Sequence, residues 1–275
     1  MDRILSKNQV CFYENDFARL ILGDTFQILP KLRRESIDMI FADPPYFLSN
    51  DGITCKGGKM VSVNKGEWDR VDGDASAVAN KHRFNRKWIR QCKKVLKPNG
   101  SIWISGTLHN IYSIGMALEQ EGFKIINNIT WQKTNPPPNL ACRCFTHSTE
   151  TILWAQKDDK KARHYFNYNL MKELNGGKQM KDVWTGSLTR QSEKRYGGHP
   201  TQKPEYLLER IVLASTEEGA VVLDPFCGSG TTGVAAVRNS RYFIGIDNVE
   251  DYLDIARKRL EAEEKITSFS EAGTN

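Results

Sequence analysis

The chain has 275 residues, 39% of them hydrophobic, and a formal net charge of +6 at pH 7. This length is enough for one large α/β domain or for one domain that carries an insert. The mean hydropathy is −0.53, no apolar run reaches about 18 residues, and the start lacks a signal-peptide core, so we expect a cytoplasmic protein with no membrane span. The mild positive charge permits a polyanion partner without proving one.

The six cysteines do not follow a pattern typical of disulfides or metal sites. They include one Cys-x-Cys pair, and no Cys/His cluster has zinc-binding spacing. We therefore expect reduced thiols and no metal ion. The cysteines are Cys11, Cys55, Cys92, Cys142, Cys144 and Cys227.

The first strand-and-helix unit is predicted near the N-terminus. Residues 19–24 form a short apolar run that ends in Gly-Asp, and Phe26, Leu29 and Leu32 then follow at helical spacing. Asp24 has two interpretations: it caps the helix, or it contacts a ligand at the carboxyl end of the strand.

The Asp-Pro-Pro-Tyr turn that follows residues 37–42 is the first candidate site. The apolar run predicts a buried strand, and the two prolines stiffen the turn and remove two backbone donors. Asp43 and nearby carbonyls then offer only acceptors, which suits an amine substrate, while Tyr46 adds an aromatic face for a base with an exocyclic amino group. A proline-braced turn without chemistry remains the alternative.

A long polar loop and several regular elements come next. Residues 47–81 are rich in Gly, Asn, Asp and Ser, as binding loops and lids often are, and Trp68 within them is a candidate substrate contact. The basic face of the next helix is typical of a solvated surface. The expected elements are a helix at 85–96, a strand at 101–105, a helix around 111–118, and strands at 123–131 and 150–155.

Residues 157–198 interrupt this alternation. They are polar and basic, with aromatic residues such as Tyr165, Tyr168 and Trp184 between the charges. We interpret them as an insert outside the sheet, with a composition that suits phosphate contacts and base stacking. A bland surface insertion is the alternative.

A glycine-rich turn between a strand at 220–223 and a helix is the second candidate site. Such a turn brings the backbone close to a ligand at a helix N-terminus, and it is not a P-loop because the Gly-Lys-Ser/Thr ending is absent. Asp247 ends the next strand about 20 residues later, where an acid can bind the ribose hydroxyls of an adenosine-type cofactor. The turn runs Asp224-Pro225-Phe226-Cys227-Gly228-Ser229-Gly230-Thr231-Thr232.

The two motifs together resemble the amino-methyltransferases of DNA, in which the first holds the target base and the second binds S-adenosylmethionine. The order here, with the catalytic motif first, resembles the beta group, and the match covers nearly the whole chain. More closely, the chain is similar to DpnA-like adenine methyltransferases of GATC restriction-modification systems, with residues 199–204 as the family element before the cofactor strand.

The resemblance implies roles for particular residues. Asp43 and the Pro44 carbonyl would accept the hydrogens of the adenine N6 amine, and Tyr46 would stack on a flipped base. The implied catalytic residues are Asp43, Pro44, Pro45 and Tyr46. The implied cofactor contacts are Asp24, Asp43, Lys203, Asp224, Pro225, Phe226, Cys227, Gly228, Ser229, Gly230, Thr231, Asp247 and Asn248. The candidate DNA contacts are Trp68, Lys160, Lys161, Arg163, Arg190 and Arg195.

Several alternatives to adenine methylation stay open. N4-cytosine methylation uses the same pocket logic, although its enzymes more often begin the motif with Ser. The hypothesis that the substrate is RNA or a protein glutamine has less support, since the protein-methylating motif usually begins with Asn. A non-catalytic DNA-binding module would leave Asp43 idle. C5-cytosine chemistry would need a thiolate, typically after proline, and no Pro-Cys dipeptide occurs.

The expected fold is a doubly wound, mostly parallel sheet with helices on both faces, in which Asp43 and the Asp224 loop lie at the carboxyl ends of neighbouring strands. The resemblance implies DNA, double- or single-stranded, as the substrate, and both a monomer and a homodimer remain open. The expected units are a catalytic half at 1–156, a target-recognition insert at 157–198, a cofactor-binding half at 199–264 and a flexible tail at 265–275.

Overall fold

The protein is described from a computed structural model. The structure describes residue 4 and residues 11–46, 53–56, 59–62, 75–157 and 162–272. Three expected site residues, Trp68, Lys160 and Lys161, lie outside these residues. No helix in the described part of the chain is both long and apolar enough to cross a membrane.

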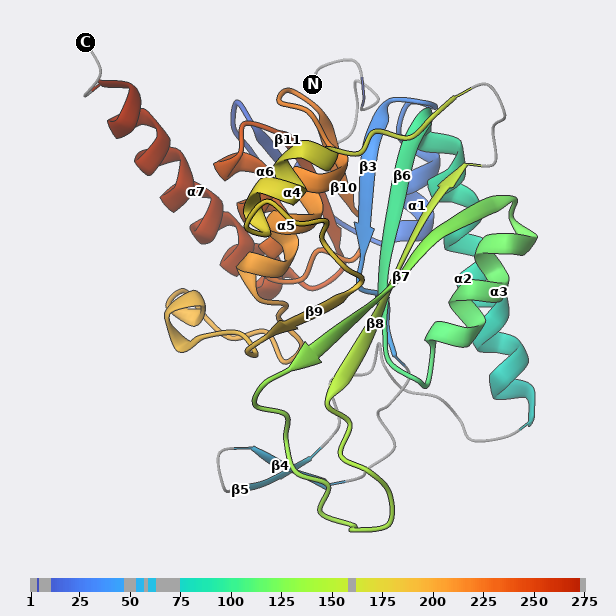
Figure 1. The fold of residues 1–275 in the computed structure, drawn as a ribbon. Helices are drawn as coiled ribbons and strands as arrows, with labels where there is room; N and C mark the ends of the chain where they lie inside the picture. The colour runs from blue at the N-terminus through green and yellow to red at the C-terminus, as the bar shows by residue number, and fades with distance from the viewer. Residues whose placement is uncertain are drawn as a thin grey trace.

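A nine-stranded sheet in the order β1-β2-β11-β10-β3-β6-β8-β7-β9 forms the centre of the protein (Figure 1). Strands β2, β11, β10, β3 and β6 are mutually parallel, whereas β1 and β8 run antiparallel to their neighbours. This confirms the doubly wound, mostly parallel fold. The strands are β1 (Tyr13–Glu14), β2 (Ala18–Leu22), β3 (Ile37–Ala42), β6 (Leu96–Gly106), β7 (Phe123–Lys133), β8 (Thr149–Lys157), β9 (Val183–Gly186), β10 (Val221–Asp224) and β11 (Tyr242–Asp247).

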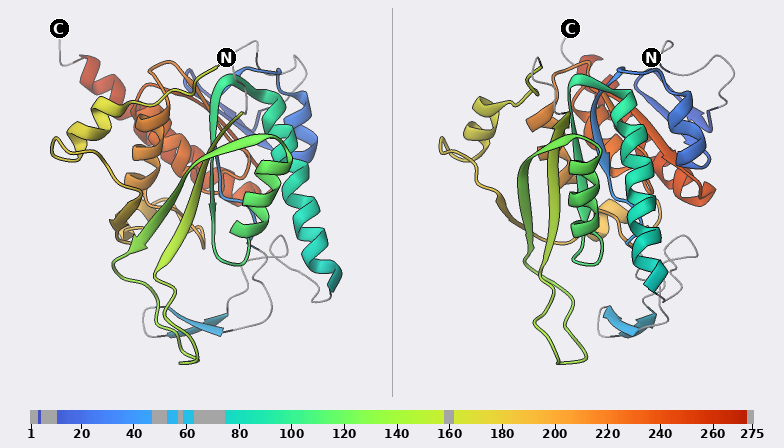
Figure 2. Two further views of the ribbon diagram at one scale, coloured as in Figure 1. Left: turned by 45° about the vertical axis from the view of Figure 1, so that its right-hand side comes forward. Right: turned by 90° about the vertical axis from the view of Figure 1, so that its right-hand side faces the viewer.

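Helices cover both faces of this sheet, which gives three layers (Figure 2). Because side chains alternate along a strand, Ile40 and Ile102 pack on one face with α1, α2 and α3, while Phe41 and Trp103 pack on the other with α5, α6 and α7. The helices are α1 (Thr25–Ile28), α2 (Ala75–Val95), α3 (Ile111–Gln120), α4 (Tyr168–Leu174), α5 (Glu205–Ser215), α6 (Thr231–Arg238) and α7 (Glu250–Ala272), with 3-10 turns η1 (Leu29–Lys31) and η3 (Gln191–Lys194).

Three boundaries differ from the expectation. Residues 157–198 do not lie wholly outside the sheet, because β9 pairs in parallel with β7 and its Trp184 is buried against the core. The strand is only four residues long, so its period was too short to recognise. Helix α2 begins ten residues before the expected start at 85, at Ala75, and a separate hairpin, β4 (Ile53–Lys56) with β5 (Lys59–Ser62), lies in the expected loop. Helix α7 continues to Ala272, so the expected tail from 265 begins as helix.

Candidate active site

Four adjacent parallel strands each end in, or lead directly into, an aspartate. In the order of the sheet, β2 leads to Asp24, β11 ends at Asp247, β10 ends at Asp224, and β3 leads to Asp43. The carboxyl ends of parallel strands meet at one edge, so the two sequence motifs become neighbours although about 180 residues separate them. This confirms that Asp43 and the Asp224 loop lie on neighbouring strands.

A cleft of about 300 Å³ opens at this edge. Its lining includes all the predicted catalytic residues and every predicted cofactor contact except Gly230. It also includes residues that the sequence did not single out as contacts. These are Gly23, Thr25, Phe26, Phe41, Phe84, His199, Thr201, Gln202, Leu208, Thr232, Val249 and Tyr252.

A buried lysine holds the Asp43 carboxylate. Lys203 Nζ donates to Asp43 Oδ2 at 2.6 Å and to the Tyr46 hydroxyl at 2.8 Å, and Glu150 Oε2 lies 3.5 Å away. Burial alone would lower the pKa of Lys203, but the carboxylates of Asp43 and Glu150 raise it well above its usual value. The ammonium group therefore stays charged and offsets the negative charge of Asp43.

The ring of Tyr46 is buried rather than open to a ligand. The side chain is 4% exposed, and its hydroxyl donates to Asp43 Oδ1 and lies 3.4 Å from Ser105 Oγ. Burial, followed by the charge of Asp43, raises the pKa of Tyr46. Stacking of this ring on a flipped base stays a prediction. Lys203 Nζ lies at the hydroxyl end of the ring, 5.3 Å from the ring centre.

Two buried amides fix the proline turn. Asn110 Nδ2 donates to the Pro45 carbonyl at 3.0 Å, and Asn85 Nδ2 donates to Asn110 Oδ1 at 2.7 Å. Both asparagines are almost fully buried, where an unmade hydrogen bond is costly. The turn is therefore held from α2 and from the start of α3, as well as by its own prolines.

The glycine loop requires its glycines. Gly230 has φ +73°, and a Cβ there would come within 2.7 Å of the Ala256 side chain. Gly228 has φ +48°, and a Cβ there would lie 3.1 Å from the His199 ring. The loop backbone can therefore pass close to α7 and to the segment that carries His199 only without side chains at these positions.

Asp224 stabilises this loop from inside. Its oxygens accept hydrogen bonds from the Phe226 amide at 3.0 Å and from Thr232 Oγ1 at 2.6 Å. Burial raises the pKa of Asp224 to about 7 despite these two bonds. The geometry gives Asp224 a role in shaping the loop, and the direct cofactor contact that the resemblance implies stays a prediction, since Asp224 also lines the cleft.

Asp247 and Asp24 also contact backbone amides. Asp247 accepts from Gly228 N at 2.8 Å and from Val249 N at 2.9 Å, and burial raises its pKa. Each carboxylate oxygen has a second lone pair, so these bonds leave capacity for ribose hydroxyls. Asp24 caps α1 by accepting from Phe26 N at 2.7 Å, which was one of its two expected interpretations.

Cys227 lies in the loop, but its thiol is not activated. The side chain is 6% exposed, and burial raises the pKa of the thiol well above its usual value. A buried neutral thiol is a poor nucleophile.

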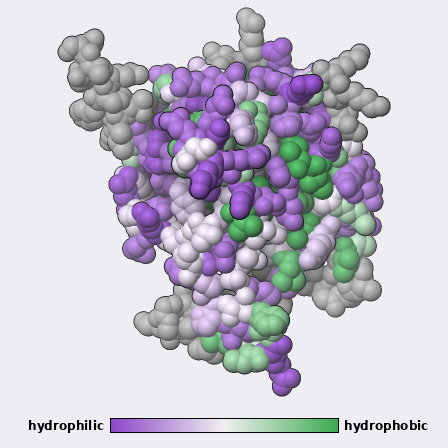
Figure 3. All heavy atoms as spheres, in the orientation of Figure 1, coloured by the Kyte–Doolittle hydropathy of each residue, from purple (hydrophilic) through white to green (hydrophobic). Residues whose placement is uncertain are grey.

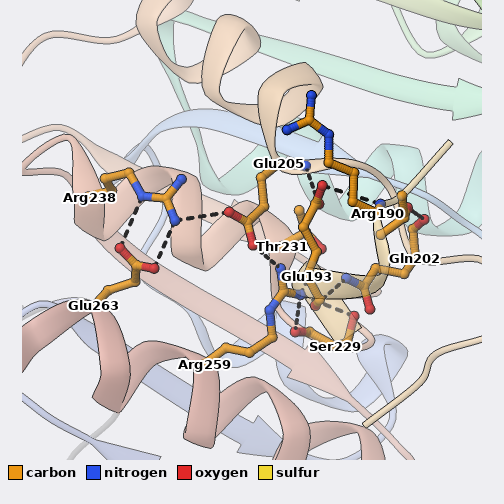
Figure 4. Close-up of polar contacts among 10 residues, drawn as sticks. Arg190, Glu193, Gln202, Glu205, Ser229, Thr231, Arg238, Arg259 and Glu263 are labelled. Carbon is orange, nitrogen blue, oxygen red and sulfur yellow. Dashed lines mark hydrogen bonds and ion pairs between the residues drawn. The ribbon is translucent and has the colours of Figure 1, made fainter. Parts of the chain in front are cut away.

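An ionic network supports the loop from behind (Figure 4). Arg259 on α7 donates to the Ser229 carbonyl at 2.8 Å and to Thr231 Oγ1 at 2.9 Å, and it pairs with Glu205 at 2.9 Å. Arg238 on α6 joins Glu205 to Glu263. Because Glu205 begins α5 two residues after Lys203, the network ties the cofactor loop to the segment that holds Asp43.

Helix direction explains one of the missed lining residues, Tyr252. His199 and Tyr252 meet edge to face, with ring centroids 4.3 Å apart. Tyr252 lies in the first turn of α7, which starts just after β11 and therefore at the edge that carries Asp247. The sequence already contained this signal, because the helix starts just after the strand that ends in Asp247. The contact of Glu150 with Lys203 joins two distant segments and had no local signal.

The predicted DNA contacts within the described residues do not share one edge. Strand β8 begins opposite Gly106 and ends near Ser101, so it runs away from the Asp43 edge. Arg163 follows its far end, and nine residues span about 26 Å. Arg190 and Arg195 are exposed on the segment after β9, which returns to the cleft at His199.

Fold and cleft together define an α/β protein with a nucleotide-type site at the carboxyl edge of its sheet. The family model described as DNA methylase matches residues 37–258. The chain therefore belongs to this N6/N4 DNA methylase family, and the resemblance read from the two motifs is confirmed.

Relatives named as Type II methyltransferases match nearly the whole chain. The Type II methyltransferase M2.DpnII of Streptococcus pneumoniae is 71% identical over 252 residues, which cover 92% of each chain. The Type II methyltransferase M2.MboI of Moraxella bovis is 53% identical over 250 residues, or 90% of each chain.

Two solved structures are also similar. The M1.HpyAVI-SAM complex is 29% identical with a TM-score of 0.65, over 88% of this chain and 98% of that chain. The cytosine-N4-specific PvuII DNA methyltransferase has a TM-score of 0.73 over 95% of this chain and 94% of that one. At 20% identity, the second supports the fold alone.

Proposed function

We propose that this protein transfers a methyl group from S-adenosylmethionine to the exocyclic N6 of adenine in DNA, in GATC sites, as the modification enzyme of a restriction-modification system. The observation that carries the proposal is the shared cleft. The acceptor turn at Asp43 and the glycine loop after Asp224 line the same 300 Å³ space from adjacent strands.

The cleft fits S-adenosylmethionine in its size and donors. Its volume is at the lower end of ordinary small-molecule sites. In this proposal Asp247 accepts from the ribose hydroxyls, the loop backbone that begins at Phe226 holds the methionine portion, and Asp24 approaches the adenine. When bound, the cofactor supplies an electrophilic methyl group on a sulfonium.

Asp43 and the turn act on the amine of the base. The adenine amine is a weak nucleophile because its lone pair is delocalised into the ring. By accepting the amine hydrogens, Asp43 and the Pro44 carbonyl localise that pair toward the methyl group. Lys203 takes the place of an amine in the described contacts, since its ammonium donates to Asp43 at 2.6 Å. The base must therefore displace or share this contact, and the remaining catalysis comes from positioning.

Adenine is favoured over cytosine by the first residue of the motif, which is Asp43 rather than Ser. GATC is proposed from the resemblance to DpnA-like enzymes and from the relatives named M2.DpnII and M2.MboI. We place part of the DNA-reading surface on the exposed arginines Arg190 and Arg195, beside the cleft rim at His199.

The test is methyl transfer from radiolabelled S-adenosylmethionine onto defined oligonucleotides, single- and double-stranded, with and without GATC. Digestion to nucleosides identifies the product. N6-methyladenine confined to GATC-containing DNA is the expected result. N4-methylcytosine would replace adenine as the target, and methylation of GATC-free DNA would exclude the site. Size-exclusion chromatography of the same sample distinguishes a homodimer from a monomer.

A further inference from the structure

The connection between β7 and β8, residues 134–148, projects from the sheet as an arm (Figure 1). It leaves the sheet beside Gly106, at the carboxyl end of β6, and therefore at the edge that carries Asp43. If extended, the arm can reach about 20 Å, which exceeds the depth of either groove of DNA. The space-filling view shows apolar and polar residues together at this projecting end (Figure 3).

Just after its tip, the arm presents an aromatic ring to solvent. Phe145 is 96% exposed, the largest value among the large hydrophobic residues that the structure describes. Arg143, two residues earlier, is also exposed, and residues 134–148 contain no Asp or Glu. An exposed ring beside a cation and without acids suits bases and phosphates, because rings stack on bases and arginine pairs with phosphate.

The arm has a defined conformation before any ligand binds. Pro136, Pro137 and Pro138 fix the backbone on the way out. Asn139 then organises the tip, because its Oδ1 accepts from Ala141 N at 3.1 Å and its Nδ2 donates to the Cys144 carbonyl at 2.7 Å. A preformed tip loses little conformational entropy when it binds.

The base of the arm is joined to the catalytic turn. Lys133, which ends β7, pairs with Glu150 at 2.7 Å, and Glu150 lies 3.5 Å from Lys203. Lys203 in turn holds Asp43 at 2.6 Å. The base of the arm and the acceptor for the base therefore share one set of largely buried ion pairs.

We propose that the arm is a DNA-insertion element in which Phe145 enters the duplex as an apolar wedge beside the target base and Arg143 contacts a phosphate. This inference rests on the proposed function, because it takes DNA as the substrate. Apolar wedges of this kind unstack base steps. Unstacking next to the target lowers the cost of extruding the base toward Asp43.

The test measures DNA binding directly, by fluorescence anisotropy on a duplex, alongside methyl transfer. Phe145→Ala should weaken binding about 5- to 100-fold, and Phe145→Trp should restore it, because either ring can stack. With 2-aminopurine at the target position, Phe145→Ala should also reduce the fluorescence increase that reports base extrusion. Neither change touches the core, since the ring is 96% exposed.

Arg143→Gln should weaken binding and lower the slope of log affinity against log salt by about one unit. The matched control is Arg34→Gln, which removes an exposed arginine just before β3 and therefore at the opposite edge. This control should leave both quantities unchanged.

The outcomes separate the arm from the proposed function. The proposed role of the arm is wrong if Phe145→Ala and Arg143→Gln both keep the wild-type DNA affinity, salt slope and 2-aminopurine signal, even if methyl transfer is normal. If the wild-type protein binds DNA through the arm but transfers no methyl group, the proposed function is wrong and the proposed role of the arm stands. A wild-type protein that does not bind DNA would reject both.

Discussion

The two halves of the sheet carry different kinds of site. In the parallel half, β2-β11-β10-β3, the functional carboxylates have intramolecular partners, as Asp224 has in Thr232 and Asp247 in Gly228. In the other half, β6-β8-β7-β9, the most prominent group is Phe145, which stands in solvent. If the proposals hold, the cofactor side is built before any ligand binds, whereas the side that carries Phe145 makes its main contacts only in the complex with DNA. Changes to the first should affect stability and cofactor binding, and changes to the second only DNA binding.

The strongest test of this division is Asp43, which lies where the halves meet. Asp43→Ala should lower methyl transfer at least about 100-fold, because the amine loses its acceptor, while S-adenosylmethionine still binds with reduced affinity. Single-turnover transfer and isothermal titration measure the two effects. Asp43→Asn keeps the volume beside buried Lys203 and guards against misfolding. Near-normal transfer by either variant would contradict the assignment.

Arg259 tests the parallel half for stability. Arg259→Met should lower the free energy of unfolding by about 1–3 kcal/mol, because the Ser229 carbonyl loses a buried donor while Glu205 keeps its pair with Arg238. It should also raise the dissociation constant of S-adenosylmethionine and leave that of DNA unchanged.

The control for Arg259 lies on the same helix. Arg257 pairs with Asp254 and Glu261 at the surface, so Arg257→Met should cost about 1 kcal/mol or less. Urea denaturation compares the two variants. Equal losses would mean that the ionic network does not support the loop.

The sequence alone predicted the parallel half well for a physical reason. There, each strand leads straight into its functional turn, so local patterns such as the run before Asp43 or the glycines after Asp224 contain the information. The resemblance then supplied the roles. Lys203 was also named as a site residue from the sequence, as a cofactor contact, but its contact with Asp43 depends on the fold.

The other half was predicted less well because its determinants are not local. Strand β9 has four residues, and only its pairing with β7 identifies it. The insert at 157–198 is polar and basic throughout its sequence, yet β8 carries Arg163 to the edge opposite Asp43. Phe145 had no signal, because exposure is a property of the folded chain.

Asp247 sharpens the comparison with Phe145. Asp247→Ala should raise the dissociation constant of S-adenosylmethionine roughly 10- to 150-fold, which corresponds to about 1.5–3 kcal/mol for lost charge-assisted bonds. DNA affinity should stay at the wild-type value, the reverse of the result expected for Phe145→Ala. Parallel titrations with S-adenosylmethionine and with duplex DNA measure the two dissociation constants. A loss of DNA affinity as large as the loss of cofactor affinity would remove the distinction between the halves.

The pH dependence of stability should reveal the buried Asp224. Its pKa is about 7 in the folded protein and about 4 when unfolded. The folded state therefore binds more protons between these values, so this group makes stability fall as pH rises, by up to about 1.4 kcal/mol per pH unit. Above about pH 7 the contribution is constant.

Asp224→Asn isolates this effect because the amide does not titrate. The difference in free energy of unfolding between wild type and variant should change between about pH 4 and pH 7 and then level off. Urea denaturation at several pH values measures it. A difference independent of pH would show that Asp224 titrates as it does in the unfolded chain.

The smallest effect is expected at Cys227, in the middle of the cofactor loop. Its backbone amide donates to the Ile246 carbonyl at 3.0 Å, a bond that any residue other than proline can make. Burial keeps the thiol neutral, so it has no role as a nucleophile in transfer to an amine. Cys227→Ser and Cys227→Ala should each keep transfer within about threefold of wild type, with stability lowered by about 1 kcal/mol. The alanine variant separates the chemistry of the thiol from the cost of a buried hydroxyl. If both variants fold and bind S-adenosylmethionine but transfer no methyl group, covalent catalysis by the thiol returns as the explanation, and the loop is more than a cofactor cradle.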